Sequence, residues 1–587
     1  MSTYLRFSFS DLLVLFFLLL TASLSSPQPL CHQDESLALM QFKDSFIIHN
    51  DTFSSCYPKT ASWSVEAEHG RSDCCSSWDG VECDPHTAHV IGLDLSYNCL
   101  YGSINSNSSL FRLSHLRRLN LAHNDFNYSK IPSTIGNLSR LTYLNLNCSH
   151  VSGEVPYEIS YLSKLSSLDL SCNNHDLHIG SLTRLQGSLL IPPPSINNYL
   201  VRNNSFTGEV SPLFCNLSSL SVLDLSFNNL SGLLHPCFCN LSQTLQALVL
   251  QSNNISGTIP DAWAKGCSLR LIDLSHNQFQ GLLPRSLANC KELGHLDVGY
   301  NKIHDTFPLW LETLTKLKVF ILRSNGFYGA IRNIQINCTF SNLHIIDLSD
   351  NNFFGDLPGE CFQRWNAMKL FGANESQYMD YDIRFSFTLP LTLTRGIKLE
   401  YERIQHELKV IDLSCNRFEG EIPEVVGNLK GLHILNFSNN AISGHIPSSL
   451  ANLTNLEILD LSQNKFFGEI PPQLAQLTFL AFFEVFNNCL TGPIPHGNQF
   501  ETFPNSSFDG NPGLCGRPLS KACGDSLHIH DPTSTFEENQ DSVSSFEFGW
   551  KVVVIGYGCG FVIGIFIGQW VIARKQDWFV NVFRIKK

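Results

Sequence analysis

Charged side chains are scarce in this sequence. Only 16% of its 587 residues are Asp, Glu, Lys or Arg, whereas a typical soluble domain has about 25%. The net charge is -13, and no basic stripe occurs outside the extreme C-terminus. Because binding to phosphate needs clustered Lys and Arg, this composition excludes a nucleic-acid-binding protein. With 43% hydrophobic residues, the chain needs another source of surface polarity.

Two apolar runs lie near the ends of the chain. Near the start, Arg6 precedes the short apolar run Leu12–Leu20 and then several small residues, an order typical of a secretory signal peptide, here 1–26. This run is too short to span a bilayer. Near the other end, Val552–Ala573 has Gln569 as its only strongly polar side chain. As a helix it would be about 33 Å long, so the sequence predicts one transmembrane helix, 552–573.

The charges around this helix predict its orientation. Residues 525–551 form an acidic juxtamembrane segment, whereas the tail 574–587 is basic, with Arg574 and Lys575 directly after the helix. The positive-inside rule therefore predicts a single-pass type I protein of the plasma membrane with its N-terminal part outside the cell. The tail is too short to bury a core of its own, so we expect any signal to pass through a partner protein.

Between the two ends, leucines recur with a fixed period. The pattern L-x-L-x-x-N is seen in Leu223–Asn228 (LDLSFN) and Leu459–Asn464 (LDLSQN), among others. It is the leucine-rich repeat, in which the two leucines point to one side of a short strand and become buried when coils stack. The expected fold is an α/β solenoid of fifteen coils. The Asn position, where Ser149 is the one exception, falls at residues 98, 124, 149, 173, 204, 228, 253, 277, 301, 325, 351, 416, 440, 464 and 488.

Two intervals between Asn positions are longer than the others. The interval from Asn351 to Asn416 is long enough for more than two coils, which predicts an island insertion (361–408) between a first repeat block (91–360) and a second (409–508). The interval from Asn173 to Asn204 exceeds one coil by a smaller margin. Coils lost near this second irregularity would alter what the protein recognises.

Cysteines flank the repeats, where a solenoid needs caps for its exposed core. In the N-terminal cap (27–90), Cys75 and Cys83 are disulfide candidates, and in the C-terminal cap (509–524), Cys515 and Cys523 are. A zinc site built from Cys74, Cys75 and Cys83 is the alternative, but secretion favours disulfides and the spacing is not that of a zinc finger. We expect no metal and no cofactor.

Cysteines within the repeats divide into pairs and single thiols. Cys215 and Cys239 stand at the same distance after an Asn position in adjacent coils, so we predict a disulfide between them. Cys267 and Cys290 are one position out of phase and form a weaker candidate pair. A redox or metal pair at Cys237 and Cys239 is less favoured than structural sulfur. Single buried thiols are expected at Cys99, Cys148, Cys172, Cys415 and Cys489.

After the Asn position most coils read x-Leu/Phe-x-Gly-x-Ile-Pro, as in Gly257–Pro260 and Gly444–Pro447. From signal peptide to tail, the chain resembles the plant leucine-rich-repeat receptor-like proteins, the disease-resistance receptors that lack a kinase. The resemblance implies a plant-type extracellular superhelix, in which this segment adds a second strand. It also implies detection of a pathogen-derived or endogenous ligand by the concave face and the island, and signalling in defence through partner receptor-like kinases that dock on the coils after the island.

Candidate ligand-binding residues follow from the outward strand positions and from the island. Tyr and Arg are frequent in protein interfaces, although ordinary solvated surface or loop packing is the alternative for each position. The candidates are His123, Tyr143, Arg202, His295, Asp297, Arg323, Asp350, Tyr378, Tyr381 and Tyr401.

N-linked glycans would supply the missing surface polarity. Two of the acceptor residues, Asn147 and Asn436, fall on outward strand positions, so that glycans there would exclude a ligand. The fifteen N-x-Ser/Thr acceptors are Asn50, Asn107, Asn127, Asn137, Asn147, Asn203, Asn216, Asn229, Asn240, Asn254, Asn337, Asn374, Asn436, Asn452 and Asn505.

Glycines recur along one face of the predicted transmembrane helix. Gly556, Gly560, Gly564 and Gly568 stand at every fourth position, and small residues at this spacing let a second helix approach closely. We expect this face to pack against a membrane-spanning kinase.

Other functions fit the sequence less well. A developmental peptide-hormone receptor subunit would share every feature above, whereas an inhibitor of secreted cell-wall hydrolases would lack the membrane span. No enzyme is expected, because the recurrent Asp of LDLS belongs to the repeat and no nucleophile, base and oxyanion grouping stands out. The pair His528 and His530 could hint at metal, but it lies in the acidic juxtamembrane segment.

Overall fold

A computed structural model describes residues 30–48, 57–64, 66–67, 70–71, 73–173, 184–331, 338–369, 389–392, 398–401, 405 and 407–523. The chain divides into two units, 1–523 and 524–587. The predicted signal peptide, juxtamembrane segment, transmembrane helix and tail lie outside the described residues. Within the described residues, no helix has the length and apolarity that a membrane crossing requires.

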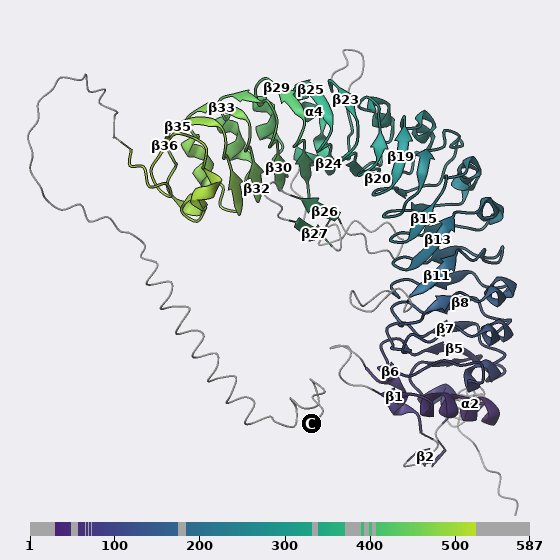
Figure 1. Cartoon of the computed structure of the whole chain (residues 1–587). Helices are drawn as coiled ribbons and strands as arrows, with labels where there is room; N and C mark the ends of the chain where they lie inside the picture. Colours follow the sequence, from purple (N-terminus) through teal and green to yellow (C-terminus); the bar gives the residue numbers. More distant parts are fainter. Residues whose placement is uncertain are drawn as a thin grey trace, which may run out of the picture. The chain divides into compact units, whose positions relative to one another are not determined.

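A 16-stranded sheet lines the inner side of an arc (Figure 1). Its first strand, β4 (Val81–Cys83), pairs antiparallel with β5, and the remaining fifteen strands run parallel, one from each predicted coil. The prediction of a solenoid is therefore confirmed. The fifteen are β5 (Val90–Asp94), β7 (Arg118–Asn120), β8 (Tyr143–Asn145), β10 (Ser167–Asp169), β12 (Asn198–Leu200), β14 (Val222–Asp224), β16 (Ala247–Val249), β18 (Leu271–Asp273), β20 (His295–Asp297), β22 (Val319–Ile321), β24 (Ile345–Asp347), β28 (Val410–Asp412), β30 (Ile434–Asn436), β32 (Ile458–Asp460) and β34 (Phe482–Glu484).

The apolar core runs as columns through the stacked coils. Leu248, Ile272 and Leu296 pair in register across β16, β18 and β20, and none of them is more than 1% exposed. Burying one such side chain contributes about 1.5–3 kcal/mol. Because each column needs a neighbouring coil on both sides, the core has no natural end within the array.

A second column consists of the side-chain amides at the Asn position. The amide nitrogen of Asn277 donates to the carbonyl oxygens of Leu250, Leu274 and Ser275 at 2.8, 3.2 and 3.1 Å, and its oxygen accepts from the Ile255 N–H at 3.0 Å. These backbone groups belong to two adjacent coils, so each Asn joins its own coil to the previous one. The exception, Ser149, donates its hydroxyl to the Leu121 carbonyl oxygen at 2.9 Å, and therefore satisfies part of the same need.

Short strands and 3-10 helices complete each coil. At the turn of the x-Gly-x segment, Gly257 has φ +81°, a left-handed conformation that glycine adopts without a steric penalty. The side strands are β9 (Gly153–Glu154), β11 (Leu185–Ser188), β13 (Ser205–Glu209), β15 (Asn229–Ser231), β17 (Ser256–Thr258), β19 (Gln278–Gly281), β21 (Lys302–Ile303), β23 (Tyr328–Gly329), β25 (Asn352–Asp356), β29 (Arg417–Glu419), β31 (Ser443–Gly444), β33 (Lys465–Gly468), β35 (Cys489–Pro493) and β36 (Gly513–Cys515). The 3-10 helices of the coils are η2 (Ser109–Arg112), η3 (Ser133–Asn137), η4 (Tyr157–Tyr161), η6 (Pro212–Asn216), η7 (Pro236–Gln243), η8 (Arg285–Asn289), η9 (Leu309–Thr313), η12 (Glu424–Asn428), η13 (Ser448–Asn452) and η14 (Pro472–Gln476).

The island does not interrupt the inner sheet. Strand β24 pairs directly with β28, with Ile345 opposite Val410 and Asp347 opposite Asp412. At the start of the predicted island, the chain forms α4 (Gly359–Arg364) and η10 (Asn366–Lys369), whose residues Phe362 and Met368 lie in the solenoid core. Further on, β26 (Leu389–Thr392) pairs antiparallel with β27 (Lys398–Tyr401). The long interval after Asn173 is bridged in the same way, because β10 pairs in register with β12.

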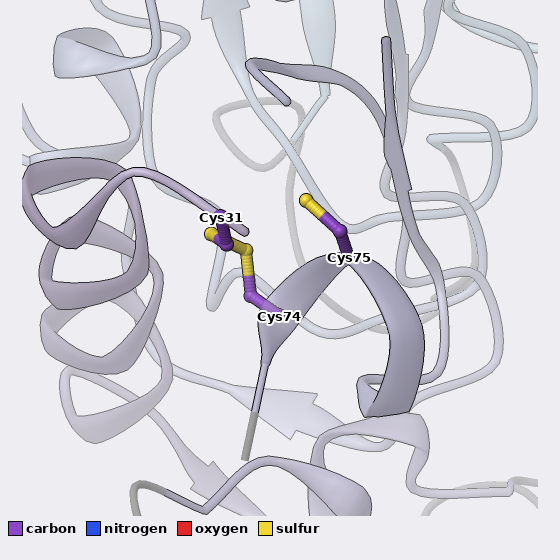
Figure 2. A group of neighbouring side chains, drawn as sticks. All are labelled: Cys31, Cys74 and Cys75. Atoms are coloured by element: carbon purple, nitrogen blue, oxygen red, sulfur yellow. A yellow bond between two sulfur atoms is a disulfide. The ribbon is translucent and has the colours of Figure 1, made fainter. Parts of the chain in front are cut away.

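Disulfides hold the N-terminal cap together. Helix α2 (Gln33–Asp44) is tied to α3 (Cys74–Ser77) by the Cys31–Cys74 bond, and Cys75 is bonded to Cys83. Figure 2 shows Cys31 and Cys74 joined, with Cys75 beside them. Since both bonds consume the thiols, Cys74, Cys75 and Cys83 are not available as zinc ligands, and the predicted disulfide is confirmed.

The C-terminal cap continues the chemistry of the repeats. Cys515 and Cys523 are bonded, as predicted. In addition, Asn511 donates to the carbonyl oxygens of Val485 and Phe508 at 2.9 and 3.0 Å and accepts from the Leu490 N–H at 3.0 Å. The cap therefore supplies one further Asn position, which the sequence pattern did not reveal because the segment before it lacks the L-x-L strand.

The predicted Cys215–Cys239 bond is wrong. Cys215 is bonded to Cys237 instead, whereas Cys239 is fully buried with its sulfur 3.9 Å from the Pro260 carbonyl oxygen. Cys215 is the fourth residue of η6, and Cys237 is the second residue of η7, so the bonded cysteines do not stand at equal distances from their Asn positions. In η7, the second residue rather than the fourth faces the neighbouring coil.

The remaining cysteines gave mixed outcomes. The weaker candidate pair, Cys267 and Cys290, is bonded, and a Cys338–Cys361 bond was not predicted. Cys99 is disulfide-bonded rather than single, with its partner outside the described residues. Reduced thiols are found at Cys148, Cys172, Cys239, Cys415 and Cys489. Contrary to the prediction of buried thiols, Cys172 and Cys415 are only partly buried and Cys489 is exposed.

We expect Asn277→Ala to destabilise the solenoid by about 1–3 kcal/mol, because the substitution leaves the buried Ile255 N–H unpaired and removes one of the two donors from each of three carbonyl oxygens. Urea unfolding would measure the change. The matched control is Gln280→Ala in the same coil, whose side chain is exposed and whose loss should change stability by less than about 0.5 kcal/mol. Equal effects of the two substitutions would contradict this role of the Asn column.

Candidate ligand-binding surface on the inner sheet

The inner surface of the arc is made of three rows of side chains. In each coil, the residues before and after the buried central strand residue point away from the core, as do Leu271 and Asp273 beside Ile272. A third row, which we call the loop row, lies just before the Asn position and has φ between +47° and +62° in every coil. The loop row consists of Tyr97, His123, Cys148, Cys172, Asn203, Phe227, Ser252, His276, Tyr300, Ser324, Asp350, Cys415, Asn439, Gln463 and Asn487.

The residue after the central strand position is an aspartate in many coils, and this acid row is largely buried. Asp273 accepts hydrogen bonds from the backbone N–H and the hydroxyl of Ser275 at 3.0 and 2.7 Å. The same pair of bonds recurs at Asp224 and Asp412. The Asp-Leu-Ser of the repeat therefore stabilises the turn after each strand, which explains its recurrence without a catalytic role.

Several of these carboxyl groups lie side by side. Asp273 is in register with Asp297, and burial together with this proximity raises the pKa of Asp297 well above its ordinary value. Burial raises the pKa of Asp273 to about 6, and burial followed by the neighbouring Asp347 raises that of Asp412 to about 7. The centre of the inner surface thus holds carboxyl groups that change charge in the mildly acidic range.

Arg323 lies over this acid row. Its guanidinium is 3.5 Å from Asp347 and 4.0 Å from Asp412, and its side chain is 13% exposed. Although burial alone would lower the pKa of Arg323, the carboxylates of Asp347 and Asp412 raise it. The guanidinium also lies 5.7 Å from the centre of the Tyr300 ring, a cation–π arrangement.

An aromatic pair borders the arginine. The rings of His276 and Tyr300 are stacked with centroids 3.9 Å apart, and His276 is exposed. Burial of the imidazole face and the nearby Arg323 lower the pKa of His276. We call His276, Tyr300 and Arg323 the central cluster, because together they offer an aromatic surface, a cation and adjacent carboxyl groups.

The first row of the inner surface changes character along the arc. It is apolar in a cluster of buried side chains that includes Val319, Ile345, Val410, Ile434 and Ile458, with the partly buried Phe482 packed against it. His295 precedes this stripe. Val222, Ala247 and Leu271 form a second apolar cluster in this row, so the apolar stripe lies on both sides of His295.

The structure brings some of the predicted ligand-binding residues together. His295, Asp297 and Arg323 meet around β20–β22, and Asp350 in the next coil accepts a hydrogen bond from the Ser324 hydroxyl at 2.7 Å. His295 and Asp297, however, are only 4% and 9% exposed, and burial lowers the pKa of His295 to about 4. These two side chains support the surface rather than project from it.

Other predicted residues lie elsewhere on the inner surface. His123 is stacked on Tyr97 with ring centroids 4.0 Å apart, the Arg118 guanidinium lies over the ring of Tyr143 at 5.8 Å, and the Arg202 guanidinium lies over that of Phe227 at 5.0 Å. All belong to coils before the central cluster. Of the island candidates, Tyr401 ends strand β27, and Tyr378 and Tyr381 lie outside the described residues.

Residues His276 and Tyr300 were missed by the sequence analysis. Both occupy the loop row, directly before an Asn position, and an aromatic residue at this position in successive coils was the available signal. The glycine face of the predicted membrane helix, and the acceptors Asn50, Asn337 and Asn374, lie outside the described residues.

A glycan does not fit at Asn436. This side chain is 1% exposed, accepts from the Ser438 N–H and hydroxyl at 3.1 and 2.7 Å, and donates to Asp412 at 3.3 Å. It takes the place of an aspartate in the acid row. A sugar on its nitrogen would break the bond to Asp412 and has no path to solvent.

We expect Asp273→Asn to stabilise the solenoid at pH 7 by about 2–3 kcal/mol. Between about pH 4 and pH 6, the folded state holds a proton that the unfolded state releases, so wild-type stability falls as the pH rises. An asparagine keeps the acceptor oxygen, as Asn436 does, but has no proton to lose. Urea unfolding at pH 4 and pH 7 should show the difference only at pH 7, with the exposed Asp356→Asn as a neutral control; a gain at pH 4 as well would refute this explanation.

Comparison with known families agrees with the repeat architecture. Residues 32–84 match the leucine rich repeat N-terminal domain, 89–361 a leucine-rich repeat region and 406–466 the leucine rich repeat. Among solved structures, the crystal structure of a TDR receptor aligns with a TM-score of 0.41 and 24% identity over 70% of this chain and 78% of that one.

Several curated proteins that are similar to this chain are named receptor-like proteins. Receptor-like protein 33 of Arabidopsis thaliana is 48% identical over 405 residues, which are 69% of this chain and 45% of the relative. Receptor-like protein 35 is 40% identical over 511 residues (86% and 50%), and receptor-like protein 54 is 42% identical over 495 (79% and 62%), both from the same plant. This chain thus spans about half the length of the curated relatives it matches. With its repeats, caps and relatives taken together, the chain belongs to the plant leucine-rich-repeat receptor-like proteins.

Proposed function

We propose that this protein is a cell-surface receptor subunit whose inner sheet binds an extracellular peptide or protein ligand, and that the ligand is of pathogen origin. The observation that carries the proposal is the central cluster, where the exposed His276 and the stacked Tyr300 adjoin Arg323 and the acid row. Aromatic and arginine side chains in such a setting are those that contribute most to protein binding.

The chemistry of the surface favours a peptide over a small metabolite. A peptide laid along the arc would meet the stacked rings of Tyr97 and His123 at one end and the central cluster further along, each presented by parallel strands at regular spacing. A rigid scaffold that fixes these groups also lowers the entropy cost of binding.

A separate kinase partner completes the proposed receptor. The resemblance to disease-resistance receptors implies signalling through receptor-like kinases, with docking on the coils after the island (409–508) and along the membrane helix. The plant receptor-like names of the relatives support a role at the cell surface. We propose defence as the setting because the repeats and caps resemble those of the disease-resistance receptors, with a developmental peptide-hormone receptor subunit as the alternative.

We expect the double substitution His276→Ala and Tyr300→Ala to weaken ligand binding at least tenfold, since it removes the stacked aromatic surface without changing the core. The measurement is binding of the full chain on plant cells to fractionated microbial extract, followed by co-precipitation of receptor kinases. The matched control is Tyr157→Ala with Tyr161→Ala, an exposed aromatic pair in helix η4 at an edge-on distance of 5.7 Å. Equal loss in both double variants would point to damage of the fold, and no loss in either would reject this binding surface.

We also expect replacement of Gly560, Gly564 and Gly568 with leucine to weaken association with the partner kinase, because bulky side chains would hold the two membrane helices apart. Co-precipitation of the kinase with the variant and with the natural chain would measure the loss. Replacement of Ile563, Ile565 and Ile567 with leucine is the control, because it leaves the glycine face intact. Unchanged co-precipitation of the glycine variant would contradict the proposed contact.

A further inference from the structure

Side chains of the loop row touch their neighbours in the next coil. Tyr97 stacks on His123 at 4.0 Å and His276 on Tyr300 at 3.9 Å. The hydroxyl of Ser324 likewise donates to Asp350 at 2.7 Å, and the amide of Asn439 donates to the Cys415 sulfur at 3.4 Å. Four unrelated pairs thus make the same kind of contact, because the loop row repeats one backbone conformation at the spacing of parallel strands.

Two cysteines occupy adjacent places in this row. Cys148 and Cys172 follow strands β8 and β10, which pair with Asn145 opposite Asp169. The register continues through the loops, since the Cys148 N–H donates to the Ser171 carbonyl oxygen at 2.9 Å. The two thiols are reduced and in hydrogen-bonding contact.

We propose that Cys148 and Cys172 are a site of reversible disulfide formation that joins the third and fourth coils when the protein meets a small-molecule disulfide. In-register residues of neighbouring parallel strands are about 4.8 Å apart, which lies within the Cα separation of about 4.4–6.8 Å that disulfides span. Thiols in contact on an extracellular protein are also exposed to an oxidising environment. The proposal does not depend on the ligand-binding function.

The two thiols have different roles in the exchange. Cys172 is partly exposed, whereas Cys148 is 6% exposed, so the Cys172 thiolate attacks one sulfur of the small disulfide and releases the other half as a thiolate. The Cys148 thiolate then attacks the Cys172 sulfur, closes the protein disulfide and releases the second half. Two protein thiols are oxidised, one small disulfide is reduced to two thiols, and the two protein protons pass to the released thiolates.

The surroundings of Cys148 make its thiol unreactive before Cys172 has reacted. The hydrogen bond with Cys172, followed by burial, raises the pKa of Cys148, and a thiol rather than a thiolate is a poor nucleophile. When Cys172 carries the small-molecule half, that hydrogen bond is lost and its contribution to the raised pKa disappears. The first step therefore activates the second.

The test uses the full chain, purified in detergent from a eukaryotic secretory host and treated with oxidised glutathione. After alkylation and proteolysis, mass spectrometry should find the Cys148 and Cys172 peptides linked, lighter by two hydrogen atoms than the sum of the reduced pair, and separated again by reductant. The same linked pair in untreated protein would equally support the proposal. Both thiols alkylated under conditions that modify Cys415, or a link that forms only after unfolding in urea, would overturn it.

Cys415 is the matched internal control. It occupies the same row with φ +52°, is partly exposed, and faces Asn439 rather than a second cysteine. It should therefore keep a glutathione adduct that no neighbouring thiol resolves. Likewise, Cys148→Ser should leave a persistent adduct on Cys172, whereas Cys172→Ser should leave Cys148 unmodified. A rapid adduct on Cys148 in the second variant would contradict the assigned order of attack.

Discussion

Each coil of this protein buries polar backbone groups that the adjacent coil must pair. The amide of Asn277 meets this need by bonding to carbonyl oxygens in its own coil and in the previous one, and the Asp-Leu-Ser turn, as at Asp273, fixes the chain just before it. Apolar columns such as Leu248 and Ile272 add the larger share of stability, but without the amides their burial would leave backbone groups unpaired. The arc, its inner surface and its caps all depend on this combination, and Asn511 extends it into the C-terminal cap.

The fold could be predicted because one short pattern repeats. The spacing of the Asn positions predicted the number of parallel strands and a longer connection between β24 and β28, although α4 and η10, at the start of the predicted island, contribute to the core. Disulfides were less predictable. Cys239 has the right distance from its Asn position but is buried in the core, whereas Cys237, two residues earlier, is bonded to Cys215. Sequence distance alone does not determine side-chain direction.

The candidate surface was predictable in place but not in detail. Alternation along a strand correctly put His295 and Asp297 on the inner side, yet both are buried. In the sheet, His295 lies between Leu271 and Val319, and Asp297 lies between Asp273 and Ile321. The exposed residue of the central cluster, His276, lies in a loop, and the left-handed backbone of this loop does not follow strand alternation. The same reasoning predicted that Asn436 faces outward as a glycan acceptor. Its side chain is buried, since an amide can replace a carboxylate in the acid row.

The direct pairing of β24 with β28 separates the packing of the inner sheet from the chain inserted between these strands. The stretch of chain between their Asn positions, Asn351 and Asn416, is the longest in the array, yet Ile345 lies in register with Val410 as in any consecutive pair of strands. The inner sheet therefore keeps its register across the inserted chain, although the first part of that chain, including Trp365 and Met368, packs into the core. A change in the length or sequence of the chain between α4 and β28 can therefore leave the inner sheet unaltered, whereas a change in a stacked strand affects both neighbouring coils.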